Sequence, residues 1–223
     1  MKITIFLLLF AAPITFGQKS EKLNQVIEKL NSVRDYSASA EITADIPMIK
    51  ILPSKATIYF KQKDKFKVES KGIALLPKQG VTELNAFLAD DSKYMAIEGE
   101  TEPISGVESR LITVIPNGDN EDIILAKIWI DEKRNVLSKT QMTTRSNGTV
   151  TVYYSYGDQA KYGLSNKMIF KIDVKEFKIP KSMSSDIHRT DETKKDKRKN
   201  GTITITLSNY KVNTGISDSI FKD

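Results

Sequence analysis

The chain has 223 residues, of which 39% are hydrophobic and 28% charged, and its formal net charge is +6. This composition is ordinary for a globular protein with one sizeable core or at most two small ones. The absence of cysteine excludes disulfides, thiol catalysis and thiolate metal sites, so core packing must hold the fold together.

The first residues predict export. Met1-Lys2 is a short basic start, residues 3–12 are almost wholly apolar, and small residues precede Gln18. This pattern is typical of a secretory signal peptide that is cleaved after Gly17. The apolar run is also shorter than the roughly 20 residues that span a bilayer. We therefore expect residues 1–17 to be removed and residues 18–223 to form a single, monomeric domain in the periplasm.

An amphipathic helix is predicted next, with Ser20 as its N-cap. Its apolar residues recur at helical spacing and form one stripe: Leu23, Val26, Ile27, Leu30 and Val33. Near Asp35 the apolar period changes from 3.6 to 2, so the helix is expected to end there.

From Tyr36 onward, alternating apolar residues and short polar turns predict β-strands. The strands are expected at residues 36–44, 56–60, 66–69, 123–131, 136–144, 149–156, 168–177 and 202–212. Asn147-Gly148 predicts a tight type I′ turn between two of them. Because no helix separates consecutive strands, we expect an antiparallel meander, and its two edges favour one large, strongly curved sheet.

Two segments depart from this rhythm. Residues 72–90 are rich in apolar side chains but interrupted by Pro77 and Gly80, which predicts helical turns lying across the sheet. Residues 181–200 are highly charged with little to bury, so they are expected to form a mobile loop before the last strand. The basic excess of this loop would attract an anionic membrane surface.

Few residues are candidates for chemistry. His188 is the only histidine, and it lies in the charged segment without the apolar support that a catalytic imidazole needs. The acidic residues at 90–91 and 119–122 lack the spacing of a calcium loop. We therefore predict a protein that is not an enzyme and has no cofactor and no metal. Nucleic acid is not expected as a partner of an exported protein.

The remaining candidate is apolar surface, since one face of each strand can look inward. The residues predicted to line an apolar cavity are Ile58, Phe60, Phe66, Val68, Ile128, Ile130, Tyr154 and Tyr156. The residues predicted to cover it as a lid are Leu75, Leu76, Phe87 and Leu88. Barrel-like sheets with a small helical cover often enclose an apolar ligand. A packed core without a ligand is the alternative interpretation of the same residues.

Several stretches occur in an informative order. They are "LNSVRDYSASAEI", "ATIYFKQKDKFKVES", "IWIDEKRNVL", "NGTVTVYYSYGD" and "VNTGISDSIF". Together they resemble the LolA/LolB-like superfamily of exported bacterial proteins, over nearly the whole chain after residue 17. The resemblance implies a mainly β fold with helices (α+β), in which a curved antiparallel sheet forms an unclosed β-barrel lidded by short helices.

The resemblance also implies a function. Members hold lipid or lipoprotein acyl chains in the apolar cavity, for lipid trafficking or outer-membrane lipoprotein sorting, and exchange them with partners in the inner and outer membranes. Ile216, Ile220 and Phe221 would then fold back after the turn at residues 213–215 and seal one end of the barrel. The arginines considered for the cavity are all expected in turns or at strand ends: Arg34, Arg110, Arg134 and Arg145.

Two other classes of function stay open from the sequence. An exported β-sheet protein can be a non-catalytic sensory or structural component of the envelope that binds a protein partner, with its cavity closed. A hydrolase of unknown type would require a buried pair of carboxylates in a cleft.

Overall fold

The structure is a computed structural model, and it describes residues 20–47, 49–62, 65–70, 84, 87–118, 122–146, 148–173, 188–189 and 200–222. The predicted signal peptide and the predicted lid residues Leu75 and Leu76 lie outside the described residues. Most of the predicted loop at 181–200 does so too.

Helix α1 (Glu21–Asn31) opens the described chain and confirms the predicted amphipathic helix. The Ser20 side chain caps it, because its Oγ accepts a hydrogen bond from the Leu23 backbone N–H at 3.2 Å. This bond satisfies one of the N–H groups that have no partner within a helix. Leu23 and Val26 are buried, so the apolar stripe faces the sheet.

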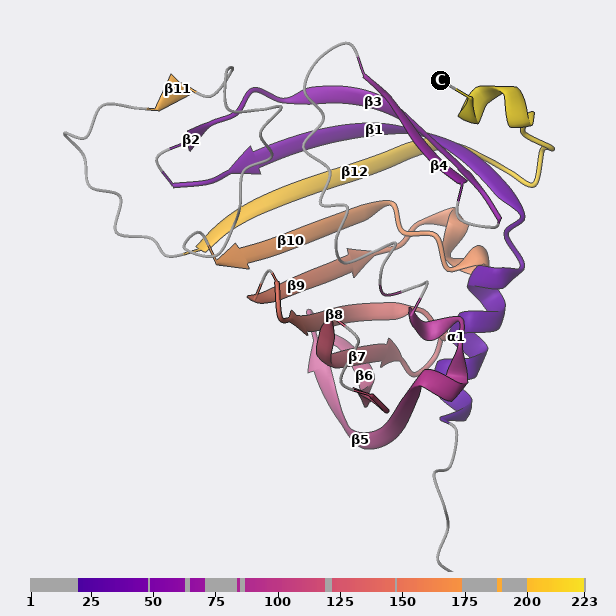
Figure 1. The fold of residues 1–223 in the computed structure, drawn as a ribbon, viewed down its shortest axis with the longest axis vertical. Coiled ribbons are helices and arrows are strands. Elements are labelled where there is room, and N and C mark those ends of the chain that lie inside the picture. Colours follow the sequence, from indigo (N-terminus) through magenta and orange to yellow (C-terminus); the bar gives the residue numbers. More distant parts are fainter. Residues whose placement is uncertain are drawn as a thin grey trace, which may run out of the picture.

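Ten strands form one antiparallel sheet, in the order β4-β3-β1-β12-β10-β9-β8-β7-β6-β5. In chain order they are β1 (Asp35–Asp45), β3 (Ser54–Lys61), β4 (Lys65–Ser70), β5 (Tyr94–Ile104), β6 (Val107–Pro116), β7 (Ile123–Asp131), β8 (Leu137–Thr144), β9 (Gly148–Ser155), β10 (Lys167–Asp173) and β12 (Asn200–Val212). The last strand inserts between β1 and β10, so the two ends of the chain meet inside the sheet. The sheet bends but leaves edges at β4 and β5 (Figure 1). The predicted unclosed barrel is confirmed.

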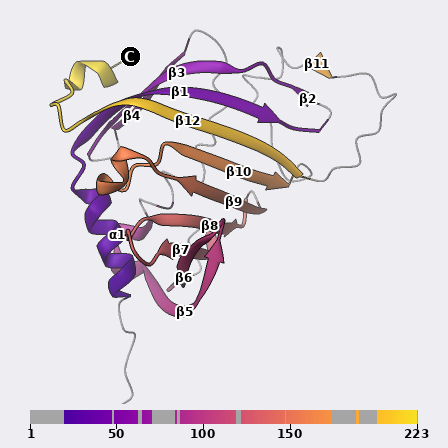
Figure 2. The same cartoon turned by 180° about the vertical axis from the view of Figure 1, so that it is seen from behind.

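Shorter elements lie at the two ends of the strands. The 3-10 helices are η1 (Asp91–Lys93), η2 (Asp158–Tyr162) and η4 (Asp218–Phe221), and a two-stranded ladder joins β2 (Ile49–Lys50) to β11 (His188–Arg189). Both views of the ribbon place α1 and η4 near one end of the long strands and β2 and β11 near the other (Figures 1 and 2). The backbone of His188, expected in a mobile loop, pairs with that of Lys50.

Two hairpins differ from the sequence predictions. The hairpin of β5 and β6 was not predicted; its connection, Ser105-Gly106, has positive φ at both residues (51° and 81°), as a type I′ turn requires. The predicted two-residue type I′ turn at Asn147-Gly148 is wrong, because the two strands pair in a different register. Gly148 has a positive φ of 69°, but it already belongs to β9 and pairs with Thr144. A longer connection therefore joins β8 to β9.

Two clusters of buried apolar side chains pack on one face of the sheet, called here the inner face. The first cluster consists of Ala38, Ala40, Ile42, Ile46, Ala56, Ile58, Val152, Met168, Phe170, Ile203, Ile205 and Leu207. The second cluster consists of Leu23, Val26, Leu84, Phe87, Leu88, Tyr94, Ile112, Val114, Ile123, Ala126, Ile128, Ile130, Leu137 and Met142. The second cluster includes side chains of α1, whereas the first draws on strands of the sheet and on Ile46.

Candidate functional site: the inner face of the sheet

The cross-strand register gathers the residues predicted for the cavity on the inner face. Side chains that are directly opposite on neighbouring antiparallel strands project to the same face. Ile58 is opposite Val68 and Ala38, and Phe60 is opposite Phe66. At the other end of the sheet, Ile128 and Ile130 are fully buried. Their role in binding a ligand stays a prediction.

These residues do not form one continuous group, because they divide between the two clusters. Ile58 belongs to the first cluster with Val68 packed against it, and Ile128 and Ile130 belong to the second. Tyr154 packs against both clusters.

The remaining predicted lining residues lie near the margins of the face. Phe60 stacks on Tyr36 with ring centroids 5.3 Å apart, and Phe66, on the edge strand β4, is 39% exposed. Tyr156 follows the last residue of β9, and burial raises its pKa well above the usual value. The residues predicted to line the cavity are therefore buried near the middle of the sheet and accessible at its β4 edge.

A pair of hydroxyl groups lies where the two clusters adjoin. Thr140, on β8, is buried, and its Oγ1 lies 3.0 Å from the Tyr154 Oη, so one hydroxyl donates to the other. Burial raises the pKa of Tyr154 to about 12. Because the two hydroxyls form a hydrogen bond with each other, their burial on the apolar face costs little free energy.

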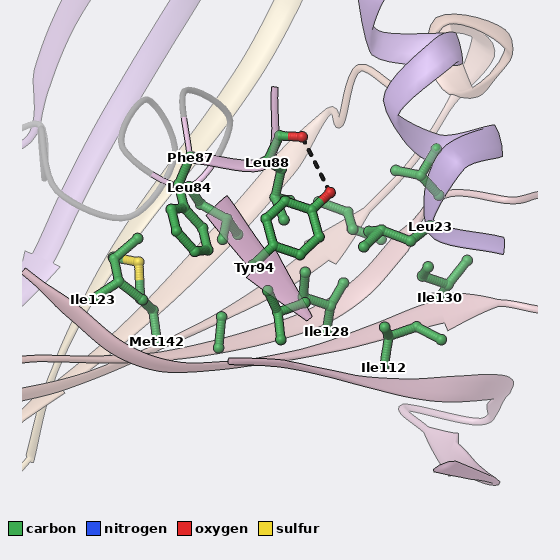
Figure 3. Close-up of a cluster of buried hydrophobic side chains, with 14 residues drawn as sticks. Leu23, Leu84, Phe87, Leu88, Tyr94, Ile112, Ile123, Ile128, Ile130 and Met142 are labelled. Atoms are coloured by element: carbon green, nitrogen blue, oxygen red, sulfur yellow. Dashed lines mark hydrogen bonds between the residues drawn. The ribbon is translucent and has the colours of Figure 1, made fainter. Parts of the chain in front are cut away.

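The predicted lid residues Phe87 and Leu88 pack firmly onto the second cluster. Both are helical and buried, and the Phe87 ring lies 5.3 Å from that of Tyr94 (Figure 3). The Tyr94 hydroxyl donates a hydrogen bond of 3.3 Å to the Leu88 carbonyl oxygen. Leu88 is thus a core residue, so a charged substitution there would destabilise the fold, and its role as a lid stays a prediction.

The first cluster has a different composition, because small side chains dominate its part of β1. Ala38, Ala40 and Ala44 project inward from β1, and Ala56 lies opposite Ala40 on β3. None of the cluster's members comes from a helix within the described residues. These alanines were not among the residues predicted for the site; the alternation at residues 38–44 is the pattern that indicates them.

Ile46 reaches the first cluster from the end of β1. A Cβ atom on Gly201 would lie only 3.2 Å from the Ile46 Cγ1, so only glycine allows Ile46 to pack this closely. Ile46 is 3% exposed. Ile46 therefore packs into the first cluster just beyond Ala44, at the end of β1.

Comparison with known proteins identifies the fold. No family model and no curated protein matches the sequence. Among solved structures, a DUF1329 family protein from Desulfovibrio piger is 12% identical with a TM-score of 0.57, covering 90% of this chain and 95% of that one. A putative outer membrane lipoprotein-sorting protein domain from Vibrio parahaemolyticus is 13% identical with a TM-score of 0.53, at the same coverage of both chains. A LolA superfamily protein from Nitrosomonas europaea is 11% identical with a TM-score of 0.54, covering 90% and 97%.

The chain has a LolA-like fold. The sequence resemblance is therefore confirmed at the level of the fold, over nearly all of this chain and of each structure compared.

One rim of the LolA-like sheet is tied to α1 by an ion network around Glu132. Its carboxylate lies 2.9 Å from the Lys22 Nζ and 2.7 Å from the Arg110 Nε. The hydrogen bonds from Lys22 and then Arg110 lower the pKa of Glu132. The prediction that Arg110 lies in a turn or at a strand end is wrong, because it lies inside β6 and pairs with Ile130.

The C-terminal segment of the LolA-like domain is fastened near the same end of the long strands as α1, at β1 and β4 (Figures 1 and 2). The Asp35 carboxylate accepts hydrogen bonds from the backbone N–H groups of Thr214 (2.9 Å) and Gly215 (3.1 Å). After this turn Ile216 is buried, and η4 contacts the edge strand β4. The chain therefore turns back toward β4 after the turn, and the sealing of one end of the barrel by Ile216, Ile220 and Phe221 stays a prediction.

The described residues contain neither a metal site nor a spanning helix. No group of three or more potential ligand side chains gathers among them. Within the same residues, no helix has the length and apolarity needed to cross a bilayer.

Proposed function

We propose that this protein binds acyl chains of a lipid or lipoprotein on the inner face of its LolA-like sheet and carries them through the periplasm. The observation that supports this most is the group of small inner-face side chains Ala38, Ala40, Ala44 and Ala56, called here the alanine row, in a cluster whose described members include no helical residue. The lipoprotein-sorting description of the similar Vibrio parahaemolyticus domain is consistent with such a cargo.

The energetics favour an acyl chain in particular. Each buried methylene contributes about 0.8 kcal/mol, so ten methylenes contribute a gross ~8 kcal/mol before the cost of immobilising the chain. No charged anchor is required for useful affinity. Ala38, Ala40 and Ala56 are buried in this structure, and Ile42 separates Ala40 from Ala44 on the same face. Because an alanine leaves more depth than a leucine above the backbone, an acyl chain would gain room along these residues if the side chains that cover them moved aside.

The cellular part of the proposal rests on the sequence. Residues 1–17 would direct export and be cleaved after Gly17, and residues 18–223 would form the single carrier domain. The carrier would act without catalysis. It would receive its cargo from one membrane partner and deliver it to another.

Filling the alanine row tests the proposal. The Ala40→Phe substitution would occupy the room along this row, so we expect it to abolish binding of a fluorescent fatty acyl probe while lowering the melting temperature only slightly. Thr43→Phe is the matched control, because Thr43 is exposed and on the opposite face of the same strand. Probe fluorescence and thermal melting are measured on all three proteins.

Two results would contradict the proposal. If Ala40→Phe destabilises the protein by the ~1–3 kcal/mol that is typical of overpacking, the alanine row is part of a filled core. If the wild-type protein takes up no probe and mass spectrometry finds no lipid bound to it, the inner face carries no acyl chain. The sensory or structural function would then be favoured.

A further inference from the structure

The outer face of the sheet carries a group of lysines that the acyl-binding proposal does not use. They are Lys127 on β7, Lys139 on β8, and Lys167 and Lys171 on β10, and we call them the outer lysine patch. The register places them opposite to the inner face, since each alternates with an inner-face residue such as Ile128 or Phe170.

The patch is organised around two aromatic rings. Trp129, Lys139 and Tyr153 are direct cross-strand neighbours on β7, β8 and β9. The Lys139 Nζ lies 3.9 Å from the centre of the Trp129 ring, and the Lys171 Nζ lies 4.9 Å from that of Tyr153. Cation–π contacts of this kind hold a lysine in place without neutralising its charge.

The positive charges of the patch are only partly compensated by nearby carboxylates. None of its four lysines forms an ion pair with a described residue. Glu102 on β5 accepts a hydrogen bond from the indole N–H of Trp129. Glu41 and Asp45 on β1 lie two strands away from Lys167 and Lys171, in the same cross-strand rows. Of the acidic residues on the lysine-bearing strands, Asp131 is buried against Arg134, and Asp173 ends β10.

The lysines are spread out and do not converge on one point. Lys127 and Lys171 share one cross-strand row but are three strands apart, which is about 14 Å at the usual strand spacing. Lys167 and Lys171 lie four residues apart on β10, or about 13 Å. A single phosphate or carboxylate would contact one of them at a time. An extended array of anions matches all four.

Exposed apolar side chains continue the same row toward the edge strand. Ile97 on β5 is opposite Thr113, which is opposite Lys127. Ile97 is 47% exposed, and Met95, two residues earlier on the same face, is 44% exposed. A basic surface that adjoins exposed apolar side chains is the composition that favours the interface of an anionic bilayer.

We propose that the outer face of β5 to β10 docks on an anionic lipid surface. The outer lysine patch would lie against the headgroup phosphates, while Met95 and Ile97 would enter the interface between headgroups and acyl chains. The attraction is screened by salt, since the Debye length falls from about 10 Å at 0.1 M to about 3 Å at 1 M. This docking uses the face opposite to the proposed acyl site and does not depend on it.

Vesicle flotation tests the proposal. Wild-type protein is expected to float with vesicles of an equal mixture of phosphatidylglycerol and phosphatidylcholine, and not with phosphatidylcholine alone. Each lysine near an anionic surface changes partitioning about fivefold, so the quadruple K127Q/K139Q/K167Q/K171Q variant should lose about 600-fold in partitioning. The matched control replaces four exposed lysines that lie outside β5 to β10 by glutamine: Lys133 and Lys161 in connections, and Lys55 and Lys211 on β3 and β12.

A second measurement locates the contact. Trp129 is the only tryptophan and lies beneath Lys139, so its fluorescence should shift when wild-type protein meets anionic vesicles. Circular dichroism checks that both variants keep the sheet. The proposal is overturned if wild type does not float, or if both variants lose flotation equally. Binding of polyglutamate but not of vesicles, lost in the patch variant, would also overturn it and would indicate an acidic protein partner.

Discussion

The Asp35→Ala substitution should release the C-terminal segment from the sheet. Asp35 is the first residue of β1 and is 5% exposed, and its carboxylate accepts the backbone N–H groups of Thr214 and Gly215. Asn213 supports the same turn, because its Oδ1 accepts the Arg34 backbone N–H at 2.7 Å. Removing the carboxylate therefore removes the acceptor that holds residues 214 and 215 against the start of β1.

The magnitude follows from these contacts. A hydrogen bond to a charged group contributes ~1.5–3 kcal/mol, which would give at least ~3 kcal/mol for two. Thr214 and Gly215 are exposed, so in the variant water can form hydrogen bonds with the released N–H groups. We therefore expect a smaller loss, of about 2 kcal/mol, in the free energy of unfolding. For a domain of this size, that corresponds to a fall of roughly 4–8 °C in the melting temperature.

Differential scanning calorimetry and amide hydrogen exchange provide the assay. Exchange should accelerate at residues 214–222 and stay slow in the centre of β1 and β12. Glu41→Ala is the control, because it removes an exposed carboxylate from the same strand. An Asp35→Ala melting temperature equal to that of the control, with unchanged exchange at 214–222, would refute the assignment of Asp35 as the residue that holds this segment.

One further substitution and one titration test other parts of the structure. Phe170→Ala should cost about 3–5 kcal/mol in urea unfolding, because Phe170 is fully buried in the first cluster; a loss below 1 kcal/mol would mean that this cluster is loosely packed. Hydrogen bonds from Lys61 and Lys65 lower the pKa of Asp218 from 3.8 to about 2. Its contribution to stability is therefore present above pH 4 and is lost as the pH falls toward 2. An NMR titration of the Asp218 carboxyl should find its midpoint near 2, and a midpoint near 3.8 would show that these ion pairs do not form in solution.

Local rules in the sequence were sufficient for most individual elements. The Ser20 cap and the apolar stripe predicted α1, and the change of period at Asp35 gave the start of β1. The prediction of residues 123–131 as a strand matches β7 at both ends. Each of these features depends on residues within a few positions of one another, so the sequence alone determines it.

The same local rules failed where the pattern was weak. Three glutamates interrupt β5 at residues 98, 100 and 102, so its alternation of apolar and polar residues is poor and the β5–β6 hairpin was missed. Ser105-Gly106 was the available turn signal. Arg110 was likewise placed in a turn because its strand had not been recognised.

The composition of the two faces was decided only by tertiary structure. β1 pairs with β12, which places Ala40 beside Leu207, a residue far along the chain, and this long-range register is not encoded in either strand alone. A shift of one residue in a strand would exchange the side chains of its inner and outer faces. The sequence determined which residues alternate together. Only the pairing of the ten strands determined that the alanine row belongs to the first cluster on the inner face, and that the outer lysine patch lies on the opposite face.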